Sequence, residues 1–229
     1  SDTVLAAVRR AVDVGPGADD AVKAALDTLA LAEQLAPQLP KVTRYVVMAA
    51  RVHMPPSSLP NVTCYEDLIE AGNENFSWSR LDERTASTLC FTSGTTGEPK
   101  GTMHFHRDVL AMCDLFPRST LKPTPQDIFC GTPPLAFTFG LGGMLCFPMR
   151  HGCSTVLMER LTPDLLLKTI QDFRATICFT APTAYRAMIP RLPEYDTKTL
   201  RKCVSAGESL PKATFEAWQA ASGIKILDG

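Results

Sequence analysis

The sequence predicts an α/β protein in which largely parallel sheets are flanked by helices. From residue 153 onward, segments rich in β-branched and apolar residues alternate with segments of helical spacing, and the connections are short. Thr162, Pro163 and Asp164 give a helix start, because a capping hydroxyl, a first-turn proline and an acid near the positive dipole end follow one another. The 45% hydrophobic content allows a sizeable buried core.

The first third of the chain shows a less regular pattern. Helical spacing covers residues 3–13 and 19–36, β-rich sequence covers 42–50, and a proline-rich loop follows. Thr63 and Glu66 have the spacing of a capping box for a short helix over residues 65–72. Composition marks no domain boundary, and the proline-rich residues 55–60 are the best candidate for one.

The remaining elements follow in a regular order. Predicted strands cover residues 87–92, 153–159, 175–180, 201–207 and 224–227, and predicted helices cover 107–116, 162–173, 182–189 and 211–222. Ligands of open parallel sheets bind where loops leave the carboxyl ends of the strands. Three unusual loops at 93–101, 131–140 and 205–210, with a fourth beginning at Asp228, therefore mark a candidate site.

Charge and cysteine usage narrow the class of protein. The formal net charge of −1 gives no electrostatic reason to expect a nucleic acid or an anionic membrane as partner. The eight cysteines include no CxxC pair, and most lie within apolar runs. We interpret them as buried, reduced thiols of a cytoplasmic protein, without a disulfide framework or a zinc site.

Two segments resemble targeting or membrane signals only superficially. Residues 128–149 carry no charge, but three prolines and four glycines would leave backbone groups unpaired in lipid. We expect a buried loop-and-helix segment there. The N-terminal apolar run contains acidic and basic residues and lacks a cleavage-type end, which argues against a signal peptide.

The stretch FTSGTTGEPKG at residues 91–101 predicts a phosphate-binding loop. Its glycines, Gly94, Gly97 and Gly101, allow backbone amides to approach a ligand closely. Hydroxyl donors come from Thr92, Ser93, Thr95 and Thr96. Lys100 supplies one flexible cation that can follow a departing phosphate group.

A Walker A loop is the main alternative for this stretch. Gly94 and Lys100 have the required separation. Pro99 removes an amide donor before the lysine, and Gly101 stands where Walker A has the Mg²⁺-binding Ser or Thr. A P-loop phosphotransferase is therefore disfavoured.

The same stretch resembles, at every position, the [YF]TSGTTGxPKG signature of the adenylate-forming enzymes, which include acyl-CoA synthetases, firefly luciferase and peptide-synthetase adenylation domains. The resemblance implies that this loop holds the pyrophosphate part of ATP. A carboxylate would attack the α-phosphate, and the thiol of coenzyme A would then capture the acyl-adenylate. Thr92, Ser93, Gly94, Thr95, Thr96, Gly97 and Lys100 are the ATP-binding residues that it implies.

Two further segments extend the resemblance. His106 and the residues Phe137, Thr138, Phe139 and Gly140 are similar to the family's acyl-binding residues, in a form typical of benzoate– and 2-aminobenzoate–CoA ligases. An aromatic carboxylate also suits a flat apolar slot beside Phe137 and Phe139. The adenine-binding segment that the resemblance implies consists of Ser205, Ala206, Gly207, Glu208, Asp228 and Gly229.

The resemblance implies that residues 1–229 are an internal fragment of the large N-terminal, AMP-binding domain of a longer enzyme. Residues 1–60 match it loosely, and residues 86–229 hold the nucleotide- and acyl-binding core. The family's Thr-Glu pair for ATP and Mg²⁺ and its C-terminal domain with a catalytic lysine would lie outside the chain. We therefore assign no catalytic residue and no metal ligand, and expect little or no ligase activity from the chain alone.

Several interpretations remain open. The leading hypothesis is an aromatic acid–CoA ligase using a carboxylic acid, ATP, Mg²⁺ and coenzyme A. A general acyl-CoA synthetase or carrier-loading adenylation domain is the first alternative, and a noncatalytic nucleotide-binding module is the second. Ordinary structural roles also compete for single residues: core packing for the phenylalanines, and helix-entry contacts for His104, His106 and Glu208. The oligomeric state is not predicted.

Overall fold

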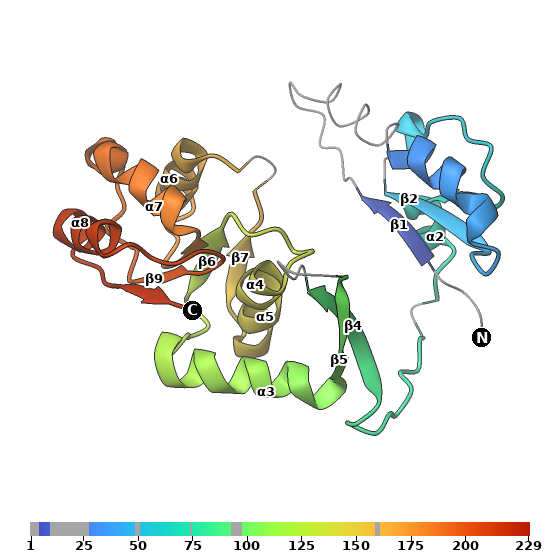
Figure 1. Cartoon of the computed structure of the whole chain (residues 1–229), viewed down its shortest axis with the longest axis horizontal. Coiled ribbons are helices and arrows are strands. Elements are labelled where there is room, and N and C mark those ends of the chain that lie inside the picture. Colours follow the sequence, from blue (N-terminus) through green and yellow to red (C-terminus); the bar gives the residue numbers. More distant parts are fainter. Residues whose placement is uncertain (1–4, 10–27, 49–50, 74, 93–97, 159–160) are drawn as a thin grey trace. The chain divides into compact units, whose positions relative to one another are not determined.

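The computed structural model describes residues 5–9, 28–48, 51–73, 75–92, 98–158 and 161–229 (Figure 1). The chain divides into two compact units, Ser1–Ser79 and Arg80–Gly229. The boundary therefore lies after residue 79 and not in the proline-rich loop at 55–60. The reason is that β3, which follows this loop, pairs with β2 and so stays within the first unit.

The first unit is built on a three-stranded parallel sheet with the order β1-β2-β3. Its strands are β1 (Leu5–Arg9), β2 (Arg44–Met48) and β3 (Val62–Cys64). Residues 28–35 and α2 (Tyr65–Glu70) are helical, with short 3₁₀ turns at Ala36–Gln38 and Arg51–His53. Leu29, Tyr45, Val47 and Leu59 form its core.

Two predictions for this unit are wrong. Residues 5–9 of the predicted helix 3–13 form β1, because they pair in parallel with the whole of β2. The run LAAVR is too short for its apolar period to separate a helix from a strand. Thr63 lies within β3 and not at a helix cap, and α2 starts after Cys64 without a side-chain cap. The helix predicted at 19–36 is confirmed from residue 28 onward, and residues 19–27 lie outside the described part.

The second unit contains a five-stranded, fully parallel sheet with the order β10-β9-β8-β6-β7. Its strands are β6 (Ile128–Gly131), β7 (Ser154–Val156), β8 (Ile177–Thr180), β9 (Lys202–Ser205) and β10 (Ile226–Asp228). Its helices are α3 (His106–Phe116), α4 (Thr138–Gly140), α5 (Phe147–His151), α6 (Pro163–Asp172), α7 (Pro182–Met188) and α8 (Lys212–Ser222). Further helical turns are η3 (Pro117–Leu121), η4 (Leu141–Cys146) and η5 (Ile189–Glu194). The predicted α/β class with a parallel sheet flanked by helices is confirmed.

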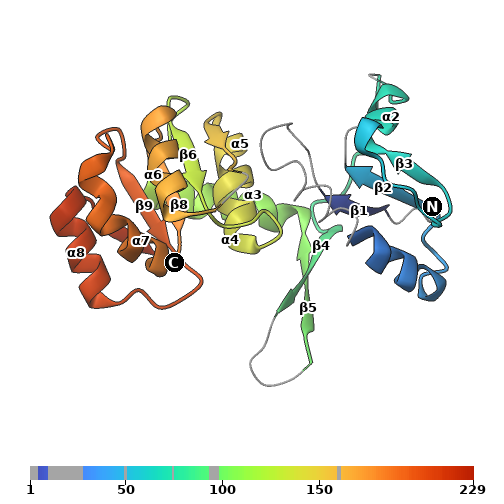
Figure 2. The ribbon, with the colours of Figure 1, turned by 90° about the horizontal axis from the view of Figure 1, so that it is seen from above.

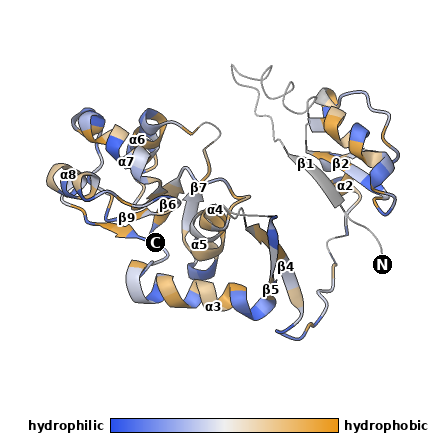
Figure 3. Cartoon of the chain, in the orientation of Figure 1, coloured by the Kyte–Doolittle hydropathy of each residue, from blue (hydrophilic) through white to orange (hydrophobic). Residues whose placement is uncertain are grey.

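Helices cover both faces of this sheet (Figure 1). On one face, α6, α7 and α8 pack on a row of three thiols, Cys130, Cys178 and Cys203, which are partners in register on β6, β8 and β9. On the other face, α3, η4 and α5 pack on alternate strand residues such as Phe129 and Phe179. Both hydrophobic and hydrophilic residues occur along α3, which packs Cys113 on the sheet and leaves Leu110 and Leu115 exposed (Figure 3).

The thiols behave largely as predicted. None of the eight cysteines forms a disulfide bond. Five are buried, whereas Cys90, Cys146 and Cys153 are half-buried.

The uncharged residues 128–149 form a buried loop-and-helix segment, as predicted, but they begin with β6, which was not predicted. Gly131 is required there, because a Cβ would lie 2.2 Å from the backbone oxygen of Phe179 on the adjacent strand. In the described part of the chain, no helix has the length and apolar composition needed to cross a membrane.

A two-stranded antiparallel sheet precedes α3. It consists of β4 (Ala86–Thr92) and β5 (Lys100–Phe105), which lie side by side as a ribbon (Figure 2). The predicted loop at 93–101 is therefore too long, since Lys100 and Gly101 already belong to β5. Pairing with β4 gives this polar, glycine-containing segment a strand conformation that its sequence does not indicate.

Candidate functional site

The carboxyl end of the five-stranded sheet brings together two of the predicted adenine-binding residues. Ser205 ends β9 and Asp228 ends β10, and the two are partners in register. The backbone N–H of Gly229 donates to the carbonyl oxygen of Ser205 at 2.8 Å. Asp228 is exposed, whereas Ser205 is fully buried and its Oγ has no hydrogen-bond partner within the described residues. This end of the sheet thus has a carboxylate open to a ligand beside an unsatisfied hydroxyl.

The segment after β9 turns sharply at Gly207. Its φ of +92° lies in the left-handed region, and nothing lies within 4 Å of the position that a Cβ would occupy. Glycine is therefore needed here for its backbone conformation and not for lack of space. Ala206, before it, is half-buried, and Glu208, after it, is exposed.

Glu208 has a protein partner in this structure. Its Oε1 accepts a hydrogen bond of 2.9 Å from the backbone N–H of Thr183 in α7. This contact, with the Thr183 side chain and nearby Arg186, lowers the pKa of Glu208. The carboxylate that the sequence assigns to adenine is thus engaged within the protein.

The predicted phosphate loop joins the two strands of the β4–β5 ribbon. Thr92 ends β4 and Lys100 begins β5, and the two residues are partners in register. Ser93, Gly94, Thr95, Thr96 and Gly97 lie outside the described residues. The structure therefore places the two ends of the loop, with Lys100 exposed at the start of β5.

The predicted acyl-binding residues lie in different environments. Phe137 is 66% exposed, whereas Phe139 is half-buried and packs on Phe179 with ring centroids 5.5 Å apart. Gly140 is buried against the loop before it, because a Cβ there would lie 2.0 Å from the carbonyl oxygen of Pro134. His106 is exposed at the first residue of α3. Four of these residues are thus consecutive in the chain but differ in exposure, and His106 lies on α3.

A cleft of about 250 Å³ lies between the β4–β5 ribbon, α3 and the turn that begins at Thr138. The two strands and α3 line it with Thr88, Cys90, His104, Asp108, Val109 and Met112. Thr138 and Leu141 complete the lining, so Thr138 is the member of the predicted acyl set that reaches the cleft.

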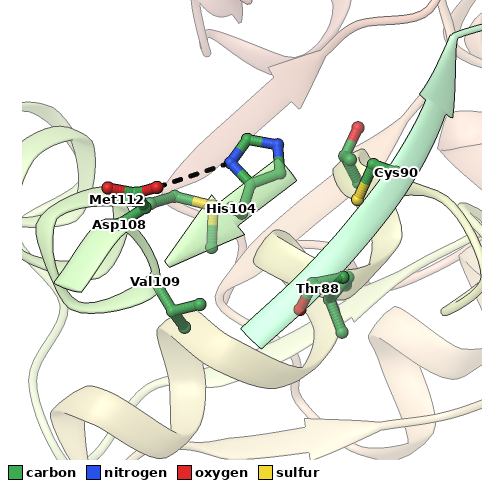
Figure 4. A pocket seen from close by; sticks show the side chains of 8 residues that line it. Thr88, Cys90, His104, Asp108, Val109 and Met112 are labelled. Atoms are coloured by element: carbon green, nitrogen blue, oxygen red, sulfur yellow. Dashed lines mark ion pairs between the residues drawn. The ribbon is translucent and has the colours of Figure 1, made fainter. Parts of the chain in front are cut away.

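Figure 4 shows His104 and Asp108 facing one another on one side of the cleft, with Thr88 and Cys90 on the other. Nδ1 of His104 lies 3.8 Å from Oδ2 of Asp108, an ion pair only when the imidazole is protonated. The sequence analysis weighed His104 but did not consider Thr88, Cys90, Asp108 or Met112 as site residues. The side-chain repeats of a strand and of a helix could have indicated them. Thr88 and Cys90 are two residues apart and share one side of β4, and Asp108 and Met112 are four residues apart and share one side of α3.

The described residues show no built metal centre. Nowhere among them do three His, Cys, Asp or Glu side chains gather closely enough to hold a metal ion. The polar groups of the site are instead a lysine, hydroxyls and single carboxylates, which suit an organic phosphate or a nucleotide base better than a bare cation.

A comparison with protein families shows the family of the chain. Residues 18–229 match the family model described as AMP-binding enzyme. The chain belongs to this family. The family resemblance noted for residues 91–101 is thereby confirmed. Among the curated proteins that match this chain are two acid–CoA ligases.

Curated relatives with similar sequences act on aromatic acids by name. The chain is 36% identical to the benzoate–CoA ligase of Thauera aromatica over 165 residues, 71% of this chain and 31% of that protein. It is 34% identical to the anthranilate–CoA ligase of Pseudomonas aeruginosa over 162 residues, 69% of this chain and 31% of that protein. The chain thus spans less than a third of the length of these two relatives.

Solved structures agree with the fold. The anthranilate CoA ligase AuaEII in complex with anthranoyl-AMP superimposes with a TM-score of 0.78 at 32% identity, covering 87% of this chain and 38% of that one. A benzoate CoA ligase from Burkholderia xenovorans gives a TM-score of 0.69 at 25% identity, covering all of this chain and 40% of that one. The α/β architecture is therefore that of part of an adenylate-forming enzyme.

Proposed function

We propose that the chain is part of an ATP-dependent aromatic acid–CoA ligase of the benzoate or 2-aminobenzoate type. The carboxylate oxygen of the acid would attack the α-phosphorus of ATP, and the bond from that phosphorus to the pyrophosphate oxygen would break. The thiolate of coenzyme A would then attack the acyl carbon, and AMP would leave. The names of the relatives and the presence of the complete FTSGTTGEPKG signature support this reaction.

The observation that carries the proposal is the position of the signature in the fold. Within it, Thr92 and Lys100 are held opposite one another by the antiparallel pairing of β4 and β5. We propose that the amides and hydroxyls of residues 92–97 bind the phosphates, and that the ammonium of Lys100 balances charge on the leaving pyrophosphate.

The nucleotide base is proposed to bind at the carboxyl end of the five-stranded sheet. Asp228 would accept a hydrogen bond from the adenine amino group, with Ser205, Ala206, Gly207 and Gly229 beside the ring. The register of Ser205 with Asp228 supports this assignment, since it brings residues 23 positions apart to one edge.

The acid is proposed to bind near the segment of Phe137, Thr138, Phe139 and Gly140, with His106 at the start of α3. Thr138 lines the cleft of about 250 Å³, and its apolar neighbours Val109, Met112 and Leu141 suit an aromatic ring better than a charged group. The carboxylate of the acid would need to point from this region toward the phosphate loop.

The test uses the full-length protein that contains this chain. We expect the wild type to exchange pyrophosphate into ATP when benzoate or 2-aminobenzoate is added, and to form the corresponding CoA thioester. Replacing Lys100 with Met, or both Thr95 and Thr96 with Val, should slow adenylate formation roughly 100-fold or more, because donors aimed at developing charge are lost. Lys225→Met is the matched control, since Lys225 is exposed and precedes β10 at the other end of the sheet.

The outcomes separate the alternatives. Exchange driven by aliphatic acids alone would favour a general acyl-CoA synthetase, and transfer to a carrier protein without CoA turnover would favour a carrier-loading domain. ATP binding without exchange for any acid would favour a noncatalytic module. Unchanged rates in the Lys100 and threonine variants would overturn the proposed role of the loop.

A further inference from the structure

The contact between Glu208 and α7 joins two segments of the second unit. Thr183 is the second residue of α7, and the cap residue of that helix, Ala181, offers no side-chain acceptor. The first-turn N–H of Thr183 would thus lack a partner if Glu208 did not supply a carboxylate oxygen from 25 residues away. This hydrogen bond therefore links the first turn of α7 to the turn at Gly207, in addition to the bonds that the Ala184 and Tyr185 N–H groups donate to the Ala181 carbonyl.

The other end of the segment is held by the sheet. Ser205 is a partner of Thr180 on β8 and of Asp228 on β10. Gly207 bends the chain between these two anchors, and its left-handed conformation sets the direction of the backbone toward Glu208. The residues 205–208 are therefore attached on one side to β9 and on the other side to α7.

The small hollow beside the Glu208 side chain is too small for a nucleotide base. The hollow that Glu208 lines with Thr183, Arg186, Ser209 and Thr214 has a volume of about 40 Å³. On this measure a water molecule needs about 10–15 Å³, so the hollow has room for about three waters, whereas ligand pockets typically have about 300 Å³ or more. By contrast, the buried hydroxyl of Ser205, at the other end of the segment, has no hydrogen-bond partner among the described residues.

From these contacts we infer that Glu208 is a positioning residue of the nucleotide site and makes no contact with adenine. It fixes residues 205–208 through the Thr183 N–H, so that Ser205 and the adjacent Asp228 keep their places. This inference rests on the proposed function, and it replaces the direct adenine contact that the family resemblance assigns to Glu208.

The first experiment reads the contact itself and does not depend on activity. Amide hydrogen exchange at Thr183 is compared in the wild type, Glu208→Ala and Glu208→Gln. We expect exchange at least tenfold faster in the alanine variant, and nearly wild-type protection in the glutamine variant, because an amide oxygen still accepts the bond. Unchanged protection in Glu208→Ala would overturn the inference.

The second experiment separates positioning from direct contact in the full-length protein. KM is measured for ATP and for purine riboside triphosphate, which lacks the 6-amino group, with Glu216→Ala as an exposed carboxylate control on α8. We expect Glu208→Ala to raise both KM values by a similar factor of about ten, to leave the KM of the acid unchanged, and to be rescued by Glu208→Gln.

A loss of discrimination between the two nucleotides in Glu208→Ala would show a direct contact with the base and overturn the inference. A wild type that binds neither nucleotide would refute the proposed function instead. The exchange rates at Thr183 would still decide whether Glu208 fixes the segment.

Discussion

The two ends of the five-stranded sheet differ in how completely their polar groups are paired. At the amino end, Asp127 precedes β6 and is only 3% exposed. Arg201 donates to both of its oxygens at 2.8 and 2.6 Å, and Thr176 and the Thr124 N–H donate at 2.7 Å each. At the carboxyl end, the Thr132 and Thr180 hydroxyls are 2.5 Å apart. Ser205 Oγ, however, has no hydrogen-bond partner in the described part of the chain, and Asp228 is exposed.

This difference suggests separate roles for the two ends of the sheet, stability at the amino end and ligand binding at the carboxyl end. A buried carboxylate is tolerated only when its hydrogen-bonding capacity is filled, and the network at Asp127 joins the amino ends of β6, β8 and β9. A binding edge requires the opposite arrangement, because groups that are already paired cannot contact a ligand. We therefore expect the amino end to govern unfolding and the carboxyl end to govern nucleotide affinity.

The same substitution at the two ends gives the largest expected difference. Asp127→Asn should lower the free energy of unfolding by about 2–3 kcal/mol, less than for a fully buried ion pair, because the Arg201 side chain is 37% exposed. Asp228→Asn should change it by less than about 0.5 kcal/mol, since Asp228 is exposed. Urea unfolding of the two variants measures both values, and equal losses would contradict the contrast between the ends.

Acid should weaken the amino end selectively. Burial alone would raise the pKa of Asp127, but hydrogen bonds from Arg201, Thr176 and Thr124 outweigh it and hold this pKa well below its usual range. A lowered native pKa contributes stability above the unfolded value near 3.9, and this contribution is lost as pH falls below it.

The stability difference between wild type and Asp127→Asn should therefore shrink by roughly 1–2 kcal/mol between pH 6 and pH 3. Comparing the two proteins at each pH isolates Asp127, because the other carboxylates titrate equally in both. A difference that is constant with pH would show that the charge of Asp127 is not what stabilises the network.

A small effect of the opposite sign is expected at Ser205. Removing a buried hydroxyl that has no partner relieves a desolvation cost, so Ser205→Ala should be neutral or stabilising by up to about 1 kcal/mol. Ser154→Ala, an exposed serine on β7, is the control within the same sheet. Thermal unfolding measures both, and a clear destabilisation by Ser205→Ala would mean that the carboxyl end is as fully paired as the amino end.

The sequence predicts best where local signals and tertiary structure agree. The capping signal of Thr162 is confirmed by its Oγ1, which accepts from the Leu165 N–H at 3.3 Å, and the strand–helix alternation gives β7 to β10. Prediction from the sequence fails where strand pairing determines the secondary structure, as in β1, β5 and β6. Their short or glycine-containing segments become strands because a neighbouring strand offers hydrogen bonds.

The candidate site shows the same limit. The sequence predicts that Ser205 and Asp228 lie close together, because both are near the ends of predicted parallel strands. The strand register, in which the two residues are partners, confirms this. The sequence does not predict that Glu208 binds the Thr183 N–H, since nothing local links residues 25 apart. Whether the predicted residues bind ATP and the acid stays a prediction.

The row of Cys130, Cys178 and Cys203 can serve as a built-in probe for local opening of the protein. These thiols lie between the sheet and α6, α7 and α8, and none has exposed surface. An alkylating reagent can reach them only when those helices separate from the strands, whereas half-buried Cys90 is closer to solvent. The rate at which a maleimide modifies the row therefore reports how often this half of the fold opens, without any introduced label.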